Sequence, residues 1–124
     1  MPMDTTIESL SDRAALINVS GSMTARSPLK ALEMQIEEIM LQGVVHLIFD
    51  VSSVDFVDSA GLGVLVHAYN KLHQKGGSLR LCGVQPRLRK ILQTTHTDTL
   101  LPIDASRQDG IAALRQLAQP ISRA

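Results

Sequence analysis

The sequence is short of the residues on which several classes of protein depend. It has one cysteine, Cys82, no tryptophan, and only three aromatic residues, Phe49, Phe56 and Tyr69. A single cysteine excludes an internal disulfide and a cysteine-built metal site. So few aromatic side chains leave no stacking platform for a single-stranded nucleic acid. We therefore expect an aliphatic core in which Cys82 is a buried filler.

Excess charge and long apolar runs are also missing. The chain has 12 basic and 12 acidic residues, a formal net charge of zero, and no basic run that would bind a phosphate backbone. No run approaches the ~20 apolar residues that span a bilayer, and the N-terminus lacks the charged and apolar blocks of a signal peptide. We therefore expect no nucleic acid and no membrane among the partners, and a cytoplasmic location.

What the sequence does contain is a repeated alternation of strand-like and helix-like segments. Its 124 residues, 44% of them hydrophobic, suit a single folded domain. Periodicity predicts strands over 5–11, 14–20, 44–51, 78–84 and 99–103, and helices that begin near Ser27, Ser59, Pro86 and Arg107. This order predicts an α/β domain with a mixed, mostly parallel sheet, edged by an antiparallel strand and covered by about four helices.

The first two helices carry clear boundary signals. Ser27 before Pro28 predicts an N-cap followed by a proline at the first helical position, and Gly43 predicts the end of that helix. The second helix is expected over 59–75, ending at a double glycine.

The segment VDFVDSAGLG, residues 54–63, joins a buried strand to the second helix. Asp58 is predicted to cap this helix by accepting a hydrogen bond from a backbone N–H two or three residues on. That leaves Ser59 at the first helical position with its hydroxyl outward, where the helix dipole tolerates a phosphate. Asp55 and Asp58 oppose the added charge, and in the simpler alternative the Asp58–Ser59 pair is only a cap.

Small residues follow Ser59 where a solvent-facing helix usually carries charge. Gly61 and Gly63 lie in the helix, where a glycine costs ~1 kcal/mol relative to alanine, so they indicate that another molecule comes close. The small face consists of Ala60, Gly61, Val64, His67 and Ala68. It either receives another protein or packs against the last strand or helix of the domain itself.

The run over residues 54–84, VDFVDSAGLGVLVHAYNKLHQKGGSLRLCGV, resembles the signature of the STAS domain, and specifically that of the bacterial anti-sigma factor antagonists. The resemblance includes the aspartate–serine step, the Gly-Leu-Gly after it, the double glycine and the strand that follows. The order of elements agrees over about residues 5–118. It implies a STAS-type single domain over 5–118, with residues 119–124 as a frayed C-terminal tail.

The same resemblance implies a function. Ser59 would be phosphorylated by an anti-sigma factor with serine kinase activity, which the unmodified chain binds so that sigma is released. Phosphorylation would break the complex, and a PP2C-type phosphatase would restore it. The chain would then be a monomer or weak dimer that needs no cofactor or metal and is not an enzyme. Asp58 would neighbour the phosphosite, and the partner-binding positions would be Ala60, Gly61, Gly63, Val64, His67 and Ala68.

The sequence departs from the family pattern at two places. Ala60 stands where the family often has a second serine, so Ser59 is the single candidate hydroxyl. Ser22 and Thr24 stand where the family commonly has acidic residues, which predicts a different choice of partner. A further alternative is a scaffold subunit of a signalling assembly or of a lipid ABC transporter, in which Ser59 is never modified.

The sequence contains no recognisable motif of the enzyme classes considered. Ser59 lacks the G-x-S-x-G context of a hydrolase nucleophile, and the Gly-Leu-Gly has neither the spacing of a P-loop nor that of a dinucleotide fingerprint. The histidines, His46, His67, His73 and His96, show no i,i+4 pairing, which argues against a zinc site.

Overall fold

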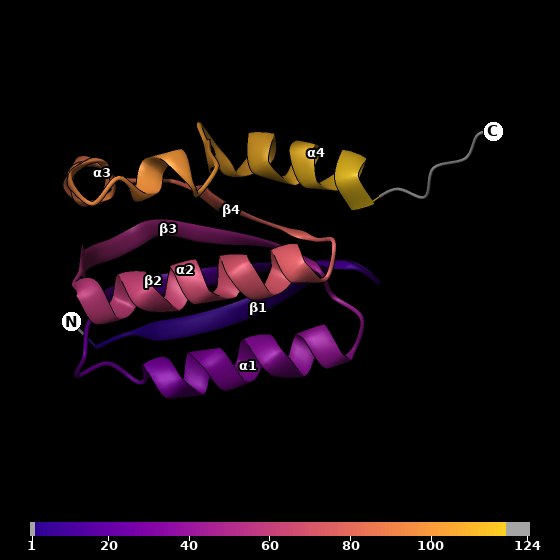
Figure 1. Ribbon diagram of the computed structural model, residues 1–124, viewed down its shortest axis with the longest axis horizontal. Helices are drawn as coiled ribbons and strands as arrows, with labels where there is room; N and C mark the ends of the chain where they lie inside the picture. Colours follow the sequence, from indigo (N-terminus) through magenta and orange to yellow (C-terminus); the bar gives the residue numbers. More distant parts are fainter. Residues whose placement is uncertain (1, 119–124) are drawn as a thin grey trace.

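The computed structural model describes residues 2–118, and the tail expected over 119–124 lies outside the described residues. Figure 1 shows strands and helices alternating along the chain. The strands are β1 (Asp4–Ser11), β2 (Ala14–Met23), β3 (His46–Val57), β4 (Ser78–Cys82) and β5 (Ile103–Asp104). The helices are α1 (Leu29–Leu41), α2 (Ser59–Gln74), α3 (Pro86–Thr94) and α4 (Arg107–Ala118), with a 3-10 turn, η1 (Thr97–Thr99).

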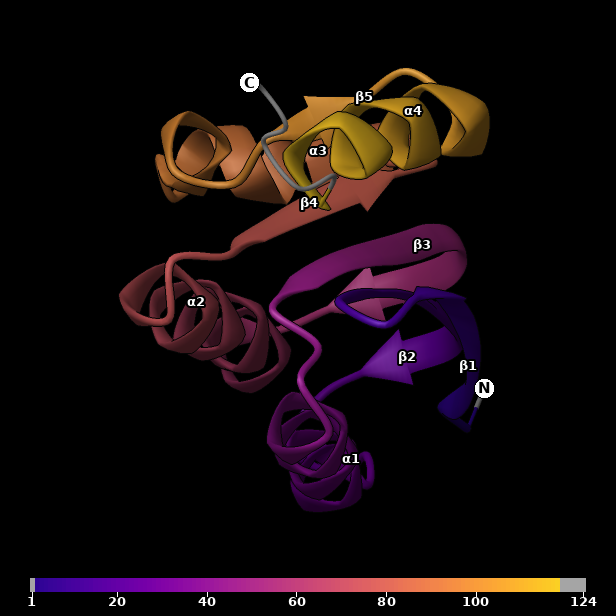
Figure 2. The same cartoon turned by 90° about the vertical axis from the view of Figure 1, so that its right-hand side faces the viewer.

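The strands form one five-stranded sheet in the order β1-β2-β3-β4-β5. The edge strand β1 runs antiparallel to β2, and every other neighbouring pair is parallel. Figure 2 looks along this twisted sheet, with α1 and α2 together on one side of it. The prediction of a mostly parallel sheet edged by an antiparallel strand is confirmed.

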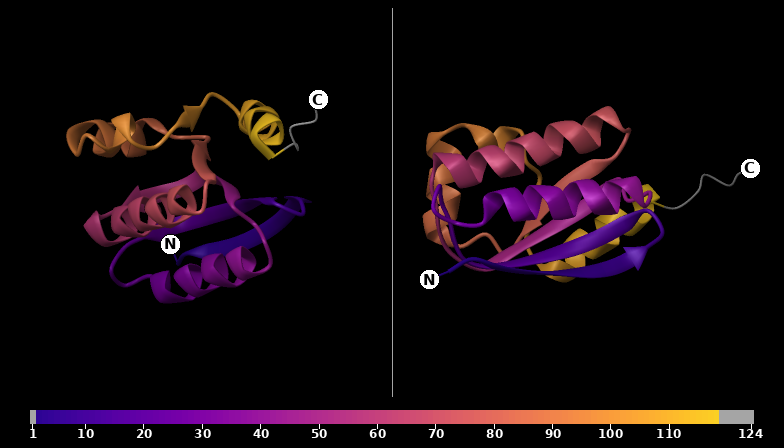
Figure 3. Two further views of the ribbon diagram at one scale, coloured as in Figure 1. Left: turned by 45° about the vertical axis from the view of Figure 1, so that its right-hand side comes forward. Right: turned by 90° about the horizontal axis from the view of Figure 1, so that it is seen from below.

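The two faces of the sheet carry separate hydrophobic clusters. Successive side chains of a strand point to opposite faces, so Phe49 joins the larger cluster while its neighbour Ile48 joins the smaller one. The larger cluster packs beneath α1, α2 and α3, and the smaller one packs beneath α4, which contributes Leu114. Figure 3 shows α1 and α2 side by side, both starting from the same end of the sheet. Cys82 is fully buried in the smaller cluster, as expected.

The bounds of several predicted strands differ from the structure. β2 was expected over 14–20 and extends to Met23, and the strand expected over 78–84 ends at Cys82. β3 was expected over 44–51 but runs from His46 to Val57, because Val54 and Val57 remain buried while Ser52, Ser53, Asp55 and Phe56 are exposed. The last strand was expected over 99–103, but η1 occupies the start of that segment and β5 begins only after Pro102. A proline cannot donate to a strand ladder, which accounts for this late start.

The predicted cap of α1 is also corrected. Pro28, not Ser27, is the N-cap residue, and no side chain caps this helix. The Ser27 hydroxyl instead donates to the Ser22 carbonyl at 2.5 Å and accepts from the Thr24 N–H at 2.9 Å. Ser27 therefore stabilises the β2–α1 loop, which borders the start of α2. Gly43, with φ +109°, follows the end of α1 as predicted.

Candidate functional site

Ser59 is the first residue of α2, and its side chain is exposed. β3 ends two residues earlier, at Val57, so Ser59 lies at the carboxyl end of a central parallel strand. In open α/β sheets this edge is where sites are usually found. Among the described residues, the Ser59 hydroxyl has no hydrogen-bond partner, which leaves it available to solvent.

The Asp58 carboxylate fixes the helix start on which Ser59 sits. Asp58 is the N-cap of α2, as the sequence predicts, and its Oδ1 accepts from the Gly61 N–H at 3.0 Å. Its Oδ2 accepts from the Ala25 N–H, also at 3.0 Å, in the β2–α1 loop. The hydrogen bonds from Gly61 and then Ala25 lower the pKa of Asp58 below its ordinary value, so it is ionised at neutral pH.

A second carboxylate near Ser59, that of Asp55, is hydrogen-bonded to the end of β2. The Ser22 hydroxyl donates to Asp55 Oδ1 at 2.7 Å, which joins the end of β2 to the end of β3. Ser22 is one of the positions where the resemblance implies an acidic residue. Here the carboxylate therefore comes from the neighbouring strand, and Ser22 is its hydrogen-bond donor.

The two glycines of α2 occupy different environments. A Cβ on Gly61 would lie 2.1 Å from the Met23 carbonyl oxygen, so the space beside Gly61 belongs to β2. The expectation that Gly61 lets another molecule approach is thereby corrected, because this glycine is buried within the chain. Gly63 is exposed, and among the described residues no atom beyond its own stretch of α2 lies within 4 Å of where its Cβ would be.

The small face predicted on α2 is largely covered by the chain itself. Val64 and Ala68 are only 6% and 3% exposed, and they share the larger cluster with Leu32 and Ile36 of α1. The alternative of internal packing therefore holds for these two positions, although α1 and not the last strand or helix covers them. His67 is exposed and Ala60 is half-buried, so these two keep an accessible surface.

Two residues that sequence reasoning missed border the same edge. Phe56 is 44% exposed although it is an aromatic residue, and it lies near the end of β3. Arg87 of α3 donates from Nη1 to the Asp55 carbonyl at 3.5 Å. Phe56 was missed because β3 was predicted to end before it. Arg87 was missed because its position depends on how α3 packs, which no local sequence pattern predicts.

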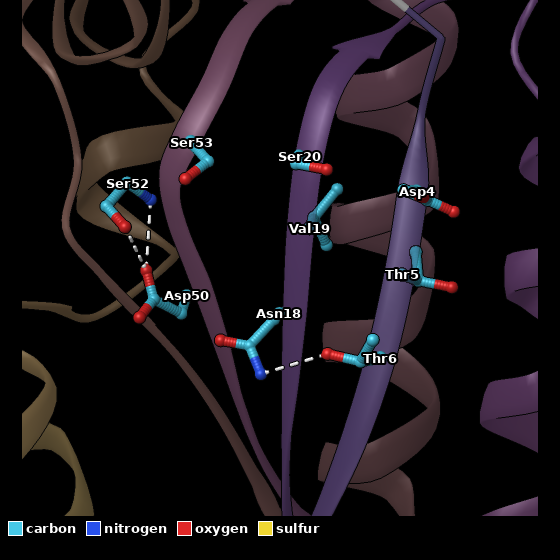
Figure 4. Close-up of a pocket in the computed structure, with 9 residues that line it drawn as sticks. All are labelled: Asp4, Thr5, Thr6, Asn18, Val19, Ser20, Asp50, Ser52 and Ser53. Carbon is cyan, nitrogen blue, oxygen red and sulfur yellow. Dashed lines mark hydrogen bonds between the residues drawn. The ribbon is translucent and has the colours of Figure 1, made fainter.

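A separate polar hollow of about 200 Å³ opens on the other side of the sheet (Figure 4). Nine residues of β1, β2 and β3 line it: Asp4, Thr5, Thr6, Asn18, Val19, Ser20, Asp50, Ser52 and Ser53. The carboxylate of Asp50 is already engaged by the N–H and hydroxyl of Ser52 and by Arg107 Nε at 2.9 Å. Burial raises the pKa of Asp50, but these hydrogen bonds outweigh it and leave the pKa lowered.

Metal-binding side chains are not clustered at either place in the described part of the chain. The lining of the hollow contains no histidine or cysteine. Within residues 2–118 no three His, Cys, Asp or Glu residues are grouped to hold a metal ion. No helix in that part of the chain is long and apolar enough to cross a membrane.

Fold and site together define a small α/β domain whose distinctive polar feature is an exposed helix start and not a deep pocket. The chain belongs to the STAS domain family, which it matches over residues 9–110.

Comparisons with individual proteins agree with this family. The chain is 30% identical over 89 residues to the anti-sigma F factor antagonist of Paenibacillus polymyxa, covering 71% of this chain and 75% of that protein. The anti-sigma factor antagonist SpoIIAA in its unphosphorylated form superimposes with a TM-score of 0.80 at 19% identity, covering 94% of this chain and all of that one. The phosphorylated form of SpoIIAA, a Bacillus cell fate determinant, gives a TM-score of 0.72 at 19% identity, covering 90% of this chain and all of that one.

Proposed function

We propose that this chain is an anti-sigma factor antagonist, a non-enzymatic binding module whose affinity for its partner is switched by phosphorylation of Ser59. The observation that carries the proposal is the exposed Ser59 hydroxyl at the first position of α2. The Paenibacillus relative bears the same functional name, which supports the assignment. The curated relatives do not favour the alternative of a transporter or scaffold subunit. We take the domain to span residues 5–118.

The proposed partner is an anti-sigma factor with serine kinase activity, and a PP2C-type phosphatase reverses the modification. Ser59 is the acceptor, and Asp58 positions it by capping α2 and holding the β2–α1 loop. Ala60, Gly63 and His67 are the accessible contact positions. Gly61, Val64 and Ala68 act through the packing that shapes this surface, because they are buried.

The physical basis of the switch is the difference between an exposed and a covered dianion. At an exposed helix N-terminus the dipole favours an anion by ~0.3–1 kcal/mol, so phosphorylation leaves the fold intact. Beneath a partner the dianion loses its water, which costs several kcal/mol per ion unless it is paired. The carboxylates of Asp55 and Asp58, both shortly before Ser59 in the sequence, add to the unfavourable charge.

The test measures the affinity of the purified chain for its anti-sigma kinase. We expect Ser59→Ala to bind as the unmodified chain does, and Ser59→Asp to bind at least about tenfold more weakly, a loss of ~1.4 kcal/mol or more. Ser53→Asp is the matched control, since it adds the same charge to an exposed serine on the polar hollow. Equal binding by Ser59→Ala and Ser59→Asp would reject the switch. Phosphate transferred from ATP to another residue would reject Ser59 as the acceptor.

A further inference from the structure

Five residues at four-residue intervals run along α2 from the candidate phosphosite. They are Ser59, Gly63, His67, Lys71 and Lys75, the last being the C-cap residue. Side chains four apart lie one above another on a helix and form a ridge, here about 24 Å long at 1.5 Å per residue. We call this set the α2 ridge. One end of it is Ser59 and the other is basic.

A groove separates the α2 ridge from α1, and Figure 3 shows the two helices that flank it lying alongside each other. The half near Ser59 is shallow and is lined by Glu33, Ile36, Glu37, Val64, His67, Ala68 and Lys71. The far half is a hollow of about 220 Å³ lined by Glu37, Met40, Leu41, Lys71 and Lys75. A salt bridge of 3.0 Å from Lys71 Nζ to Glu37 Oε2 crosses the groove between the halves.

The far half combines apolar surface with an available cation. Leu41, which lines this half, is 89% exposed, and Met34, one heptad earlier on α1 and outside the groove lining, is 65% exposed. They are the two most exposed large hydrophobic side chains of the described chain. Lys75 forms no salt bridge to any described residue, whereas Lys71 is neutralised by Glu37. Exposed leucine beside a free lysine suits a partner that is both apolar and acidic.

The charged residues of the groove also favour one orientation of a bound segment. Glu33 lines the end near Ser59, while Lys75 lines the far end. A carboxylate of a bound segment is therefore favoured at Lys75 and disfavoured at Glu33. One turn after Ser59, Gly63 leaves a gap in the ridge, and among the described residues no atom outside this stretch of α2 lies within 4 Å of where its Cβ would be. A helix glycine without an internal packing reason indicates close approach from outside.

We propose that the groove between α1 and the α2 ridge receives an amphipathic helix of the anti-sigma factor, with apolar residues against Met40 and Leu41 and a carboxylate at Lys75. Helix-in-groove docking of this kind depends on apolar anchors spaced three or four residues apart. The inference rests on the proposed function and extends its interface along the whole length of α2. The near end of the groove is lined by Val64 and His67, which follow Ser59 on α2, so a phosphate on Ser59 adds charge beside the same contact.

The test measures binding of the purified anti-sigma kinase to Lys75→Glu and Leu41→Ser. We expect Lys75→Glu to weaken binding about tenfold, with a smaller loss at high salt, and Leu41→Ser to weaken it several-fold. The matched controls are Arg115→Glu on α4 and Leu100→Ser, which make the same chemical changes at exposed positions elsewhere. Both controls are expected to bind as the unchanged protein does. A Glu→Lys or Asp→Lys substitution in the partner helix is expected to restore binding to Lys75→Glu.

The outcomes separate this inference from the proposed function. If Lys75→Glu and Leu41→Ser bind normally while Ser59→Asp does not, the groove is not part of the interface and only this inference falls. If the unmodified chain does not bind the kinase at all, both proposals fall. Thermal melts of the two variants are expected to match that of the unchanged chain, because both side chains are exposed. Loss of binding by a chain that melts normally therefore reports on the contact.

Discussion

The Met23 carbonyl oxygen occupies the place where a side chain on Gly61 would begin, 2.1 Å from an ideal Cβ. The same carbonyl accepts a hydrogen bond from the Asp58 N–H at 3.1 Å. The end of β2 and the start of α2 are thus in direct backbone contact. The position of Ser59 is set by this contact and does not depend on the flexibility of a loop.

Gly61→Ala is expected to destabilise the protein. A methyl group at 2.1 Å from a backbone oxygen forces the α2 start away from β2, and overpacking of this kind typically costs about 1–3 kcal/mol. Urea unfolding followed by circular dichroism measures the change. A stability equal to that of the unchanged chain would contradict the close approach of Met23 to Gly61.

Gly63→Ala is expected to have the opposite effect on stability. The added Cβ would contact nothing beyond its own stretch of α2, and replacing a helical glycine by alanine typically stabilises by about 0.5–1 kcal/mol. The same substitution fills the gap in the α2 ridge, so we expect weaker binding to the anti-sigma kinase. Paired melting and binding measurements check both signs. Tighter or unchanged binding would show that the gap does not face the partner.

Asp58→Asn is expected to lower the melting temperature at neutral pH and to have little effect in acid. Hydrogen bonds from Gly61 and Ala25 lower the folded-state pKa of Asp58, so its contribution is present above the unfolded pKa. That contribution is lost as the pH falls through the folded value. Melting curves of both proteins over the acid range measure the difference, which should shrink toward low pH. Asp12→Asn is the control, since Asp12 is exposed and its side chain makes no hydrogen bond or salt bridge among the described residues.

His46 is expected to make the protein less stable below pH 6.5. Burial, and then the nearby Arg13, lower its folded-state pKa from the ordinary 6.5. The unfolded chain therefore takes up a proton below pH 6.5 that the folded chain does not, and stability falls as the pH drops toward the folded value. His46→Gln should flatten this part of the urea midpoint profile. Identical profiles for the variant and the unchanged protein would contradict the assignment.

Cys82 is expected to resist alkylation in the folded protein. Burial is the largest cause that raises the pKa of its thiol, to about 11, so almost no thiolate forms at pH 8. Mass spectrometry after iodoacetamide treatment should find unmodified native chain, and complete modification in concentrated guanidinium chloride. Rapid labelling of native protein would place Cys82 outside the smaller cluster.

Much of the fold could be predicted because its signals are local. The second helix was expected over 59–75 and runs Ser59–Gln74, since its apolar period and its terminal double glycine are both contained in the segment. The length of β3 was underestimated because Ser52, Ser53 and Asp55 interrupt its apolar run, and only the buried Val54 and Val57 continue it. Tertiary pairing with β2 decides that extension, and no short pattern encodes it.

In the candidate site, too, local contacts could be predicted from the sequence and long-range contacts could not. The Asp58 cap involves residues three apart and was legible. The second oxygen of Asp58 accepts a hydrogen bond from the N–H of Ala25, 33 residues away, and no local sequence pattern predicts this contact. Val64 and Ala68 could not be assigned to a surface until α1 was placed over them, because a small residue fits a helix packing contact as well as a docking face.

The two hydrogen bonds of Asp58, from Gly61 and from Ala25, also affect how the proposed switch responds over time. The acceptor hydroxyl stands outside both hydrophobic clusters on a start of α2 that is already fixed, so adding or removing phosphate requires no rearrangement of the scaffold. A switch built this way retains no conformational history of earlier cycles. The fraction of chains able to bind would then track the current balance of kinase and phosphatase, with a delay set by those enzymes alone.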